Sequence, residues 1–502
     1  MKAITLGEII KACNGRLVCA ASAEEINAEL PGRMISKIET DSRKILPGEA
    51  NRDSLFLALK GERFDGNTFA EEAAACGVGA VLCSLPEQEA VALSAKMGNQ
   101  CAVILAENGD TQKAFGDIAA YYRSLFALPV VAVTGSVGKT STKEMIAAVL
   151  SGSRCVLKTE ANFNNEIGLP RTLLALAPQH ETAVVEMGMR GLGQIRYLCG
   201  IARPNIGVVT NIGDAHIEIL KSRENILRAK LEIASYMGDG SVLCLNGDDP
   251  LLGNRMLVEA VLSEDGKEGS VPEIIYFGTG ENASYRAKEI VSDEKGSRFL
   301  LCTPKGERRV SLAVPGRHHV GNALAAAAVA ELCGMTLSEI TRSLAAIGEN
   351  SQIRQKIIKT NIGVTVIDDT YNAGPASMQA SLDVLYDIGK GTKNRTAAVL
   401  GDMLELGEIS ERAHYEVGKH AAERGVSCLL TAGTLSKEIA RGYLEAGGCD
   451  ARCFPNSEEA ADALMQILQK GDIILVKGSH AMKMETVVRL VCAAEKLPER
   501  KG

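Results

Sequence analysis

The sequence predicts an α/β protein of about three domains. Its 502 residues are too many for one hydrophobic core, and domains typically hold about 100–200 residues. Two stretches of the chain, one beginning near residue 130 and one near residue 337, alternate short β-branched runs with helical patterns. Such alternation is typical of a parallel sheet flanked by helices. The first stretch also carries a glycine-rich loop between a strand and a helix, at residues 134–140.

The composition narrows the classes of partner. Hydrophobic residues make up 46% of the chain and charged residues 23%, as in ordinary globular proteins. The net charge of −7 offers no basic surface to nucleic acid, and 4% aromatic residues with no tryptophan offer no base-stacking surface. No apolar run is long enough to span a bilayer. We therefore expect neither a nucleic-acid partner nor membrane insertion.

The N-terminus and the cysteines indicate a cytoplasmic location. The first residues, from Met1 to Glu8, lack the apolar core of a secretion signal. The 14 cysteines are scattered without a C-x-x-C pair, which favours buried thiols in a reducing compartment. Neither a disulfide framework nor a zinc site is expected.

The first predicted domain comprises residues 1–110. Buried strands are expected at 55–59 and 79–83 and an alanine-rich helix at 69–76. The polar loop Thr40-Asp41-Ser42-Arg43 carries hydroxyls and a guanidinium that could hold a phosphate. Taken alone, that loop is better interpreted as a surface turn.

The second predicted domain, residues 111–335, contains a phosphate-binding P-loop. A strand at 130–133 and a helix at 142–150 flank the loop residues Gly135, Ser136, Val137, Gly138, Lys139, Thr140 and Ser141. Small residues let backbone N–H groups turn toward an anion, and the helix N-terminus adds partial positive charge. Lys139 is placed to reach the outer phosphates of ATP and Thr140 to bind Mg²⁺. Val133 stands where the general pattern has glycine, so this is a shorter form of the loop.

The rest of the central domain alternates strands and helices. We expect strands at 182–188, 206–211 and 241–246, a helix at 225–237, a loop at 263–272 and short antiparallel strands between 276 and 312. Ligands of parallel sheets bind at the carboxyl ends of the strands, where Glu186 and Asn211 lie.

The third predicted domain, residues 336–502, follows an alanine-rich helix at 323–333. Its strands are expected at 364–369, 396–402, 428–431 and 472–477. Three of these strands end in a polar or charged residue, as a ligand-facing edge would.

Three further residues could do chemistry beside the P-loop. Glu186 closes a strand about fifty residues after Lys139, His216 follows another strand, and Lys230 lies on a predicted helix. Each has an ordinary explanation when taken alone: a surface charge, a structural histidine and a solvated lysine. Their joint arrangement around a P-loop favours a role in binding magnesium and phosphate.

At this point the motifs resemble those of the Mur ligase family, nearly from end to end. The segments that carry the resemblance are 134–140, 159–170, 185–188, 211–216 with Lys230, 316–324, 368–375 and 401–407. In the first domain, Asp41-Ser42-Arg43 and the run from Phe56 to Gly66 resemble a uridine-nucleotide domain. The resemblance implies a small α/β UDP-binding domain, a central P-loop ATPase domain with a parallel sheet, and a C-terminal Rossmann-like domain.

The resemblance also implies an activity. Segments 368–372 and 401–407 are most similar to those of members that join D-alanyl-D-alanine to UDP-N-acetylmuramoyl-tripeptide. The implied enzyme is an ATP-dependent amide ligase with ATP and Mg²⁺ as cofactors and these two molecules as substrates. We expect it to act as a monomer.

Residue roles are implied in the same way. The P-loop residues would hold the ATP phosphates, and Thr140, Glu186, His216 and a carbamylated Lys230 would hold magnesium. Asn322 would contact adenine, Arg354 the phosphates and Asp369 the ribose. Substrate contacts would come from Ser42, Arg43, Asn164, Asn165, Tyr371 and Asn372.

Some positions depart from the family pattern. His319 stands where asparagine is usual, Gly374 where asparagine or serine is common, Asn67 where histidine is usual, and His480 where arginine is usual. Residues 49–53 interrupt the normal spacing. These departures put in doubt the nucleotide contacts around 319 and the substrate contacts around 67, 374 and 480.

Rival interpretations stay open. One is a sister ligase that adds a single amino acid, or a folylpolyglutamate synthase, although the uridine-type first domain argues against folate. Another is a P-loop switch or kinase-like module without ligase activity. The third is an α/β scaffold with a vestigial nucleotide loop, against which Lys139, Thr140 and Glu186 weigh.

Overall fold

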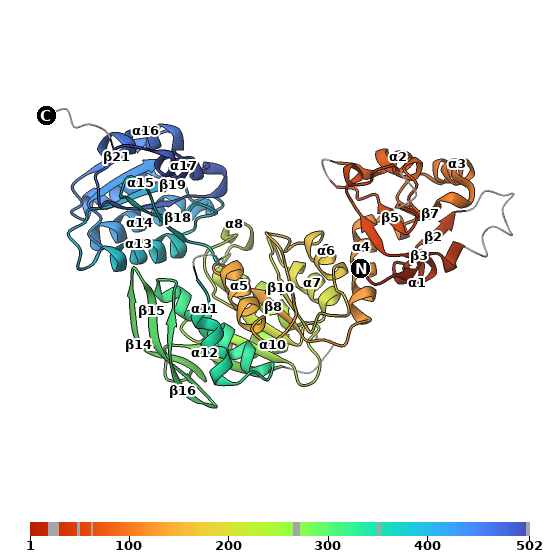
Figure 1. Cartoon of the computed structure of the whole chain (residues 1–502), viewed down its shortest axis with the longest axis horizontal. Helices are drawn as coiled ribbons and strands as arrows, with labels where there is room; N and C mark the ends of the chain where they lie inside the picture. The colour runs from red at the N-terminus through yellow and green to blue at the C-terminus, as the bar shows by residue number, and fades with distance from the viewer. Residues whose placement is uncertain (19–29, 48–50, 62–63, 265–271, 349–352, 498–502) are drawn as a thin grey trace. The chain divides into compact units, whose positions relative to one another are not determined.

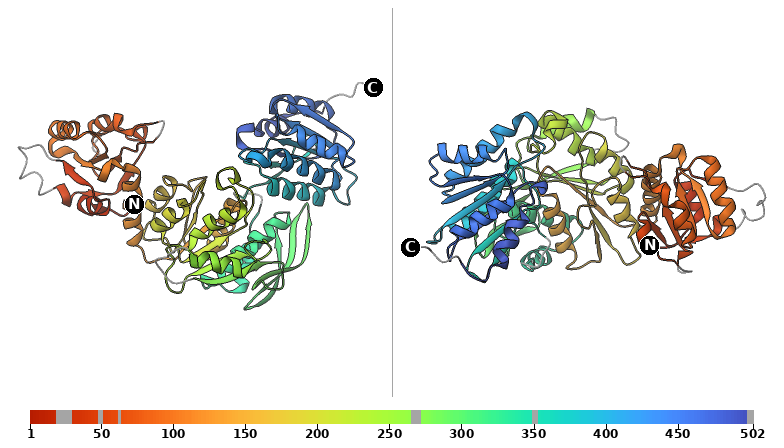
Figure 2. Two further views of the ribbon diagram at one scale, coloured as in Figure 1. Left: turned by 180° about the vertical axis from the view of Figure 1, so that it is seen from behind. Right: turned by 90° about the horizontal axis from the view of Figure 1, so that it is seen from above.

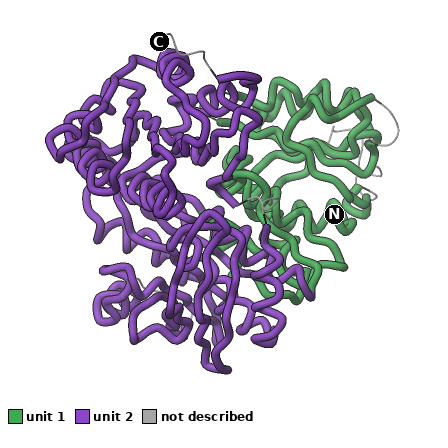
Figure 3. Tube along the Cα trace, turned by 60° about the vertical axis from the view of Figure 1, so that its left-hand side comes forward, with its two compact units in different colours: residues 1–130, 154–187, 196–204 green, residues 131–153, 188–195, 205–502 purple. Residues whose placement is uncertain are grey.

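The computed structural model of the chain contains three large sheets, all flanked by helices (Figure 1). It describes residues 1–18, 30–47, 51–61, 64–264, 272–348 and 353–497. The predicted insertion at 49–53 and the loop at 263–272 therefore lie partly outside the described residues. Two compact units are distinguished in Figure 3 and are described separately below. Unit 1 is Met1–Val130, Arg154–Met187 and Arg196–Pro204, and unit 2 is Val131–Ser153, Gly188–Ile195 and Asn205–Gly502.

Unit 1 is built on a five-stranded sheet in the order β2-β7-β6-β5-β4. The strands are β2 (Arg16–Val18), β4 (Lys37–Glu39), β5 (Ser54–Leu57), β6 (Ala80–Cys83) and β7 (Ala102–Leu105). Strands β4 to β7 are parallel neighbours, and β2 is antiparallel to β7. Every residue of β5 and β6 is buried, which explains their unbroken apolar runs. The strands predicted at 55–59 and 79–83 are found as β5 and β6, although β5 already ends at Leu57.

Helices and two strand pairs complete unit 1. The helices are α1 (Leu6–Ala12), α2 (Ala70–Ala75), α3 (Glu87–Met97), α4 (Thr111–Ser124) and α6 (Gly168–Leu174). Strands β1 (Ile4–Thr5) and β3 (Met34–Ile35) pair antiparallel, and β9 (Val156–Lys158) and β10 (Thr182–Glu186) pair parallel. The predicted helix at 69–76 begins as a 3₁₀ turn over Gly66–Phe69 and becomes α2. Two tyrosines fix α4, because Tyr121 donates to Glu8 at 2.6 Å and Tyr122 to the carbonyl of Leu176 at 2.7 Å.

The first sheet of unit 2 follows the order β16-β15-β14-β13-β12-β11-β8. Its strands are β8 (Val130–Thr134), β11 (Ile206–Val209), β12 (Val242–Asn246), β13 (Glu273–Gly278), β14 (Tyr285–Asp293), β15 (Gly296–Thr303) and β16 (Gly306–Leu312). Strands β8, β11, β12 and β13 are parallel neighbours. The expectation of antiparallel pairing from residue 276 onward is wrong for β13. Helix α10 (Arg255–Glu264) lies between β12 and β13 and provides the crossover that parallel pairing requires.

Several helices belong to this part of unit 2, and α5 directly follows the P-loop. They include α5 (Lys139–Leu150), α8 (Ile217–Leu220), α9 (Arg223–Leu231), α11 (Arg317–Leu332) and α12 (Leu337–Ala345), while α7 (Gln194–Ala202) spans the boundary between the units. The predicted helix at 225–237 gives way to a 3₁₀ turn at Glu232–Ala234. The helix expected at 323–333 instead begins at Arg317, directly after Gly316 with its φ of 110°. Its run of buried alanines allows close packing on α5.

The C-terminal sheet has six strands in the order β17-β18-β22-β19-β20-β21. The strands are β17 (Lys356–Lys359), β18 (Thr365–Asp369), β19 (Thr396–Gly401), β20 (Cys428–Ala432), β21 (Ala451–Phe454) and β22 (Ile473–Lys477). All neighbours are parallel except β17 and β18. The strands predicted at 364–369, 396–402, 428–431 and 472–477 are confirmed.

Helices cover both faces of the C-terminal sheet (Figures 1 and 2). One core contains side chains of α16 (Ser457–Ile467) and α17 (Glu485–Ala493), together with Val366 and Val399. The other contains side chains of α13 (Pro375–Gly389), α14 (Ser410–Glu423) and α15 (Lys437–Glu445), together with Ile367 and Ala398. Neighbouring residues of a strand face opposite sides, so a continuous apolar run serves both cores.

No helix within the described part of the chain is long and apolar enough to cross a membrane.

Candidate functional site

The P-loop in unit 2 is held in shape by strand β11 and the residues that follow it. Asn211 makes two hydrogen bonds to Val137: its Oδ1 accepts from the backbone N–H, and its Nδ2 donates to the backbone carbonyl, both at 2.9 Å. The Thr210 hydroxyl donates to the same carbonyl at 2.6 Å. Gly135 has a φ of 146°, and a Cβ at this position would overlap the Thr210 hydroxyl. The loop is therefore closely packed, which explains its need for glycine.

Lys139 lies at the start of α5 and folds back over the loop. Its Nζ donates to the carbonyl of Gly135 at 2.8 Å and to that of Ser136 at 3.3 Å. Gly138 caps the helix in a left-handed conformation, with φ of 83°. The loop therefore presents a lysine ammonium and a helix N-terminus to the same space, as phosphate binding requires. Thr140 is half-buried in the first turn of α5, and Ser141 is buried.

Asn322 on α11 lies beside the P-loop. A Cβ on Gly138 would be 3.5 Å from Asn322 Oδ1, and that oxygen accepts from the Thr142 hydroxyl at 3.0 Å. The Asn322 amide nitrogen is 3.4 Å from Nδ1 of the buried His319. Asn322 thus lies beside the P-loop and connects helix α5 to a buried histidine.

His216 and Lys230 share one electrostatic environment in unit 2. His216 has a left-handed φ of 63° and precedes α8, and Lys230 is only 1% exposed on α9. Burial, and next the positive charge of an unmodified Lys230, lower the pKa of His216. Burial, the larger cause, still favours the neutral imidazole when Lys230 carries no positive charge, and a neutral imidazole keeps a lone pair for a metal. The Nδ1 atom of His216 also lies 3.2 Å from the carboxylate of Glu405.

Glu186 closes strand β10 in unit 1 and is 1% exposed. Its backbone N–H donates to the Thr159 hydroxyl at 3.0 Å, and its Oε1 accepts from Asn164 Nδ2 at 2.7 Å. Its Oε2 is buried and has no hydrogen-bond partner among the described residues. A buried carboxylate oxygen without a partner is unfavourable, and a bound cation would satisfy it. The neighbouring Asn165 has a different role from Asn164: its Oδ1 accepts from the N–H of Gly168 at 2.9 Å and so caps the start of α6.

Asp369 ends strand β18 and is held by two donors. Its Oδ2 accepts from Lys477 Nζ and from the Ser381 hydroxyl, both at 2.6 Å. Lys477 is 2% exposed and also donates to the carbonyl of Asn372 at 2.8 Å. One carboxylate oxygen is thus fixed, and the carboxylate is oriented at the carboxyl edge of the sheet.

Arg354 and Tyr371 contact each other directly. The Arg354 guanidinium lies 3.6 Å from the centre of the Tyr371 ring, which is 42% exposed. The ring of His480 is 6.0 Å from that of Tyr371. The planar guanidinium is thereby held in one orientation while keeping its donors available.

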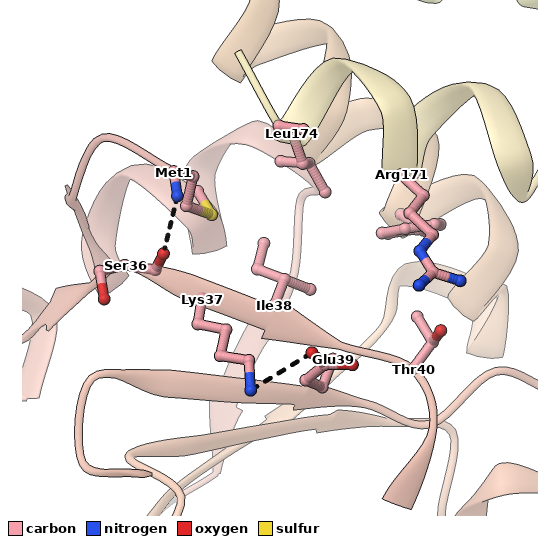
Figure 4. A pocket seen from close by; sticks show the side chains of 10 residues that line it. Met1, Ser36, Lys37, Ile38, Glu39, Thr40, Arg171 and Leu174 are labelled. Atoms are coloured by element: carbon pink, nitrogen blue, oxygen red, sulfur yellow. Dashed lines mark hydrogen bonds and ion pairs between the residues drawn. The ribbon is translucent and has the colours of Figure 1, made fainter. Parts of the chain in front are cut away.

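The predicted phosphate loop of unit 1 forms a 3₁₀ turn, Ser42–Lys44, capped by Asp41. The carboxylate of Asp41 accepts from the Arg43 side chain at 2.8 and 2.9 Å. A cavity of about 170 Å³ lies next to this turn (Figure 4). Its lining residues are Met1, Ser36, Lys37, Ile38, Glu39, Thr40, Phe115, Arg171, Leu174 and Ala175.

The side chains that could bind a metal do not form a complete site among the described residues. Within the described residues, no group of three or more His, Cys, Asp or Glu side chains could hold a metal ion. The open Glu186 oxygen and the neutral His216 are both suitable ligands, each within its own unit. An ammonium on Lys230 would repel Mg²⁺, whereas a carbamate there would attract it. Taken one by one, Glu186 and His216 are of a type that binds magnesium, and Lys230 is so only after modification.

Several residues of the site were missed by sequence reasoning. Asn211 was expected at the sheet edge, but its hydrogen bonds to Val137 were not predicted. The roles of three other residues were not predicted at all: Thr210, Ser381 and Lys477. Lys477 ends a buried strand of five residues. A charged residue at the end of such an apolar run was the one feature of the sequence that could have pointed to its role. The contacts of Thr210 and Ser381 join elements distant in sequence and left no local pattern.

Family models match most of the chain. The Mur ligase middle domain matches residues 133–330, the Mur ligase glutamate ligase domain residues 353–480, and the Mur ligase family catalytic domain residues 34–123.

Relatives match over nearly their whole length. UDP-N-acetylmuramoyl-tripeptide–D-alanyl-D-alanine ligase of Bacillus subtilis is 36% identical, covering 92% of this chain and 94% of its own. The Escherichia coli enzyme of the same name is 35% identical, covering 92% and 96%. A crystal structure of MurF from Acinetobacter baumannii superposes with a TM-score of 0.84 at 31% identity, covering 98% and 100%. The MurF ligase of Thermotoga maritima in complex with ADP gives 0.76 at 27% identity, covering 91% and 96%.

Proposed function

The chain belongs to the Mur ligase family, and we propose that it joins D-alanyl-D-alanine to UDP-N-acetylmuramoyl-tripeptide in an ATP-dependent reaction. The observation that carries this choice is the near full-length likeness to ligases of that name, across all three matched domains. The predicted three-domain α/β fold is confirmed by the same likeness. The domain boundaries at 110 and 335 remain part of the proposal.

The chemistry follows from the substrates. A carboxylate is a poor electrophile, so amide formation in water needs an activated carboxyl group. The terminal carboxylate of the tripeptide attacks the γ-phosphorus of ATP, the bond from phosphorus to the bridging oxygen breaks, and ADP leaves. The resulting acyl phosphate is attacked by the free amine of D-alanyl-D-alanine. The amine loses a proton, the carbon–oxygen bond breaks and inorganic phosphate leaves.

The P-loop supplies positioning and charge in this scheme. The backbone N–H groups at the end of the loop, from Gly138 to Ser141, cradle the phosphates, and Lys139 neutralises charge on the transferred group. The N–H groups of Ser136 and Val137 instead donate to Asn211 and hold the loop in shape. This role is supported by the two hydrogen bonds of Asn211, which fix the loop before nucleotide arrives. A preorganised loop loses little free energy on reorganisation, so its dipoles act on the transition state.

We assign magnesium to Thr140, Glu186, His216 and a carbamylated Lys230. When bound, Mg²⁺ would neutralise the phosphate oxygens and orient them for in-line transfer. The unpartnered Glu186 oxygen, the neutral His216 and the burial of Lys230 support this set. Asn164 holds the other Glu186 oxygen and so orients the carboxylate.

The remaining nucleotide and substrate contacts come from three regions. Asn322 would contact adenine, Arg354 the phosphates and Asp369 the ribose; the placement of Asn322 beside Gly138 supports the first. Tyr371 and Asn372 would approach the reacting groups. Ser42, Arg43, Asn164 and Asn165 would contact the UDP-linked substrate, although Asn165 would do so with its amide nitrogen because its oxygen caps α6.

The cavity of unit 1 is a candidate for part of the UDP-linked substrate. Its wall includes Thr40, which directly precedes Asp41-Ser42-Arg43, and a cationic Arg171 (Figure 4). We also propose that the protein acts as a monomer and in the cytoplasm, where ATP and nucleotide-linked precursors are available.

The proposal is tested by supplying ATP, Mg²⁺ and UDP-N-acetylmuramoyl-tripeptide with a panel of amines, and identifying products by mass spectrometry. The expected product is the pentapeptide nucleotide, formed only with D-alanyl-D-alanine. Products with single amino acids would favour a sister ligase instead. Phosphate release that is independent of any amine would favour a P-loop switch or kinase-like module.

A further inference from the structure

The loop that follows strand β19 is held in one conformation by contacts to distant segments. It comprises residues 402–407 (the β19 loop), and the proposed chemistry gives it no role. The backbone N–H of Met403 donates to Nε2 of His414, and that of Leu404 donates to the Ser479 hydroxyl, both at 2.9 Å. The loop is therefore anchored from two directions before it reaches its tip.

The tip of the β19 loop carries one exposed carboxylate between buried neighbours. Met403 and Leu406 lie in a hydrophobic core of the C-terminal sheet, whereas the side chain of Glu405 is 61% exposed. Glu405 has a left-handed φ of 63°, which is strained for a residue other than glycine. Strained residues of this kind are often found at functional sites.

The carboxylate of Glu405 faces His216, which directly precedes α8 in the same unit. Its Oε2 lies 3.2 Å from Nδ1 of His216. A second contact is adjacent, because a Cβ added to Gly407 would lie 3.2 Å from Cγ of Glu218 in the first turn of α8. The β19 loop therefore packs against α8 at the point where this helix begins.

The contact to Nδ1 favours one tautomer of His216. In a neutral imidazole, one ring nitrogen carries the hydrogen and the other carries a lone pair. A carboxylate beside Nδ1 stabilises the tautomer with the hydrogen on Nδ1, and the lone pair then lies on Nε2. Histidines that bind metals are commonly oriented by a carboxylate in this way.

We propose that Glu405 is a positioning residue for His216, which holds the hydrogen on Nδ1 so that Nε2 can bind magnesium. This inference rests on the proposed function, because it takes His216 as a magnesium ligand. The β19 loop is thereby given a role: it orients a metal ligand that follows β11, without touching the metal itself.

Nuclear magnetic resonance of the full chain, labelled with ¹⁵N at histidine, tests this assignment without turnover. The chain has 7 histidines, and the ring signals of His216 are identified as those lost in His216→Gln. The variants are Glu405→Ala, which removes the acceptor, and Glu405→Gln, which keeps an oxygen acceptor without charge. The matched control is Glu408→Ala, which makes the same change at an exposed glutamate of the same segment.

The wild type and Glu408→Ala are expected to carry the His216 hydrogen on Nδ1 at about pH 8, where histidine is neutral. Glu405→Ala should lose this preference, and Glu405→Gln should retain part of it. Mn²⁺, used in place of Mg²⁺ with ADP and bicarbonate present, should broaden the His216 signals. The Kd for Mn²⁺, measured by electron paramagnetic resonance, should rise roughly ten- to a hundred-fold in Glu405→Ala. Thermal unfolding that matches the control shows that the variants are folded.

An unchanged His216 tautomer in Glu405→Ala, or a wild type with the hydrogen on Nε2, would overturn the inference. An unchanged Kd for Mn²⁺ in that variant would overturn it as well. A wild type whose His216 signals do not respond to Mn²⁺ would instead overturn the proposed magnesium role of His216, which is a separate result from the tautomer comparison.

Discussion

At the scale of single residues, Glu186 combines burial with an unsatisfied charge. Its Oε2 atom has no partner among the described residues, although the side chain is 1% exposed. Retaining such a group is unfavourable for folding, so its presence is best explained by a bound cation. The same group should therefore oppose stability in the metal-free protein and support activity in the metal-bound one.

Glu186→Gln is predicted to separate these two effects. The amide keeps the shape and the acceptor for Asn164 but removes the charge, so metal-free stability should rise by about 1 kcal/mol while kcat falls by at least roughly 100-fold. Thermal unfolding with EDTA and phosphate release with Mg²⁺ measure the two quantities. Asn164→Ala is the control, since it should lower activity without the gain in stability. An active Glu186→Gln enzyme would rule out the assigned role.

Lys230 is predicted to act only after carbamylation. Lys230→Ala should abolish phosphate release, and added bicarbonate should not restore it, because no amine remains to be modified. In the wild-type protein, ¹³C-bicarbonate should give a carbamate resonance that is lost in the variant. Full activity in Lys230→Ala would reject the carbamate, provided that thermal unfolding shows both proteins folded.

At the scale of elements, Lys477 connects strand β22 to the segment between β18 and α13. It pairs with Asp369 and donates to the carbonyl of Asn372, and both charged side chains are nearly buried. This pair fixes the end of the sheet where ribose and substrate contacts are proposed. A buried ion pair contributes little net stability over apolar residues, but removing one partner leaves the other charge unpaired.

Lys477→Met is predicted to destabilise the protein by about 3 kcal/mol and to raise the KM for ATP. The double variant Lys477→Met with Asp369→Asn should recover most of the stability, because no buried charge is left, but not the KM. Urea unfolding and steady-state kinetics distinguish these outcomes. Equal stability of the single variant and the wild type would show that the pair does not hold this segment.

The sequence predicted these elements better than it predicted their contacts. The P-loop and four of the six strands of the C-terminal sheet are local patterns of apolar run, glycine and helix, and these were predicted. The two edge strands, β17 and β21, were missed. Element ends were less accurate, as for α11, which begins six residues before the expected position because Gly316 starts it. The parallel pairing of β13 was missed because pairing depends on the crossover through α10, not on the strand itself. The hydrogen bonds of Asn211 to Val137 in the P-loop were not predicted either, because they join segments that are distant in sequence.

At the scale of the whole molecule, histidines that are buried or partly buried couple stability to pH. Burial is the largest cause that lowers the pKa of His180, His216, His318, His319 and His414, to about 4 in His318. His414 shows why the neutral form is needed: its Nε2 accepts from the N–H of Met403 at 2.9 Å. A lowered pKa in a base means that the unfolded chain binds protons more readily than the folded one.

Stability is therefore predicted to be complete above about pH 6.5, where unfolded histidine is neutral, and to fall as pH drops toward the lowered folded pKa values. Each histidine that is protonated only on unfolding contributes about 1.4 kcal/mol per pH unit in that window. Urea unfolding at about pH 7.5, 6.5 and 5.5, values that bracket the ordinary histidine pKa, measures how the free energy of unfolding changes with pH. His414→Gln, which keeps a hydrogen-bond donor and an acceptor but cannot be protonated, should reduce this dependence on pH. Equal stability at all three values would contradict the account.

The central claim is that the protein activates a carboxylate as an acyl phosphate. It is tested most directly with UDP-N-acetylmuramoyl-tripeptide whose terminal carboxylate carries ¹⁸O in both oxygens, incubated with ATP, Mg²⁺ and D-alanyl-D-alanine. Because the carbon–oxygen bond of the acyl phosphate breaks when the amine attacks, the released phosphate should contain one ¹⁸O atom and the new amide the other. Phosphate without ¹⁸O would show that water, not the carboxylate, attacked ATP, and would contradict the claim.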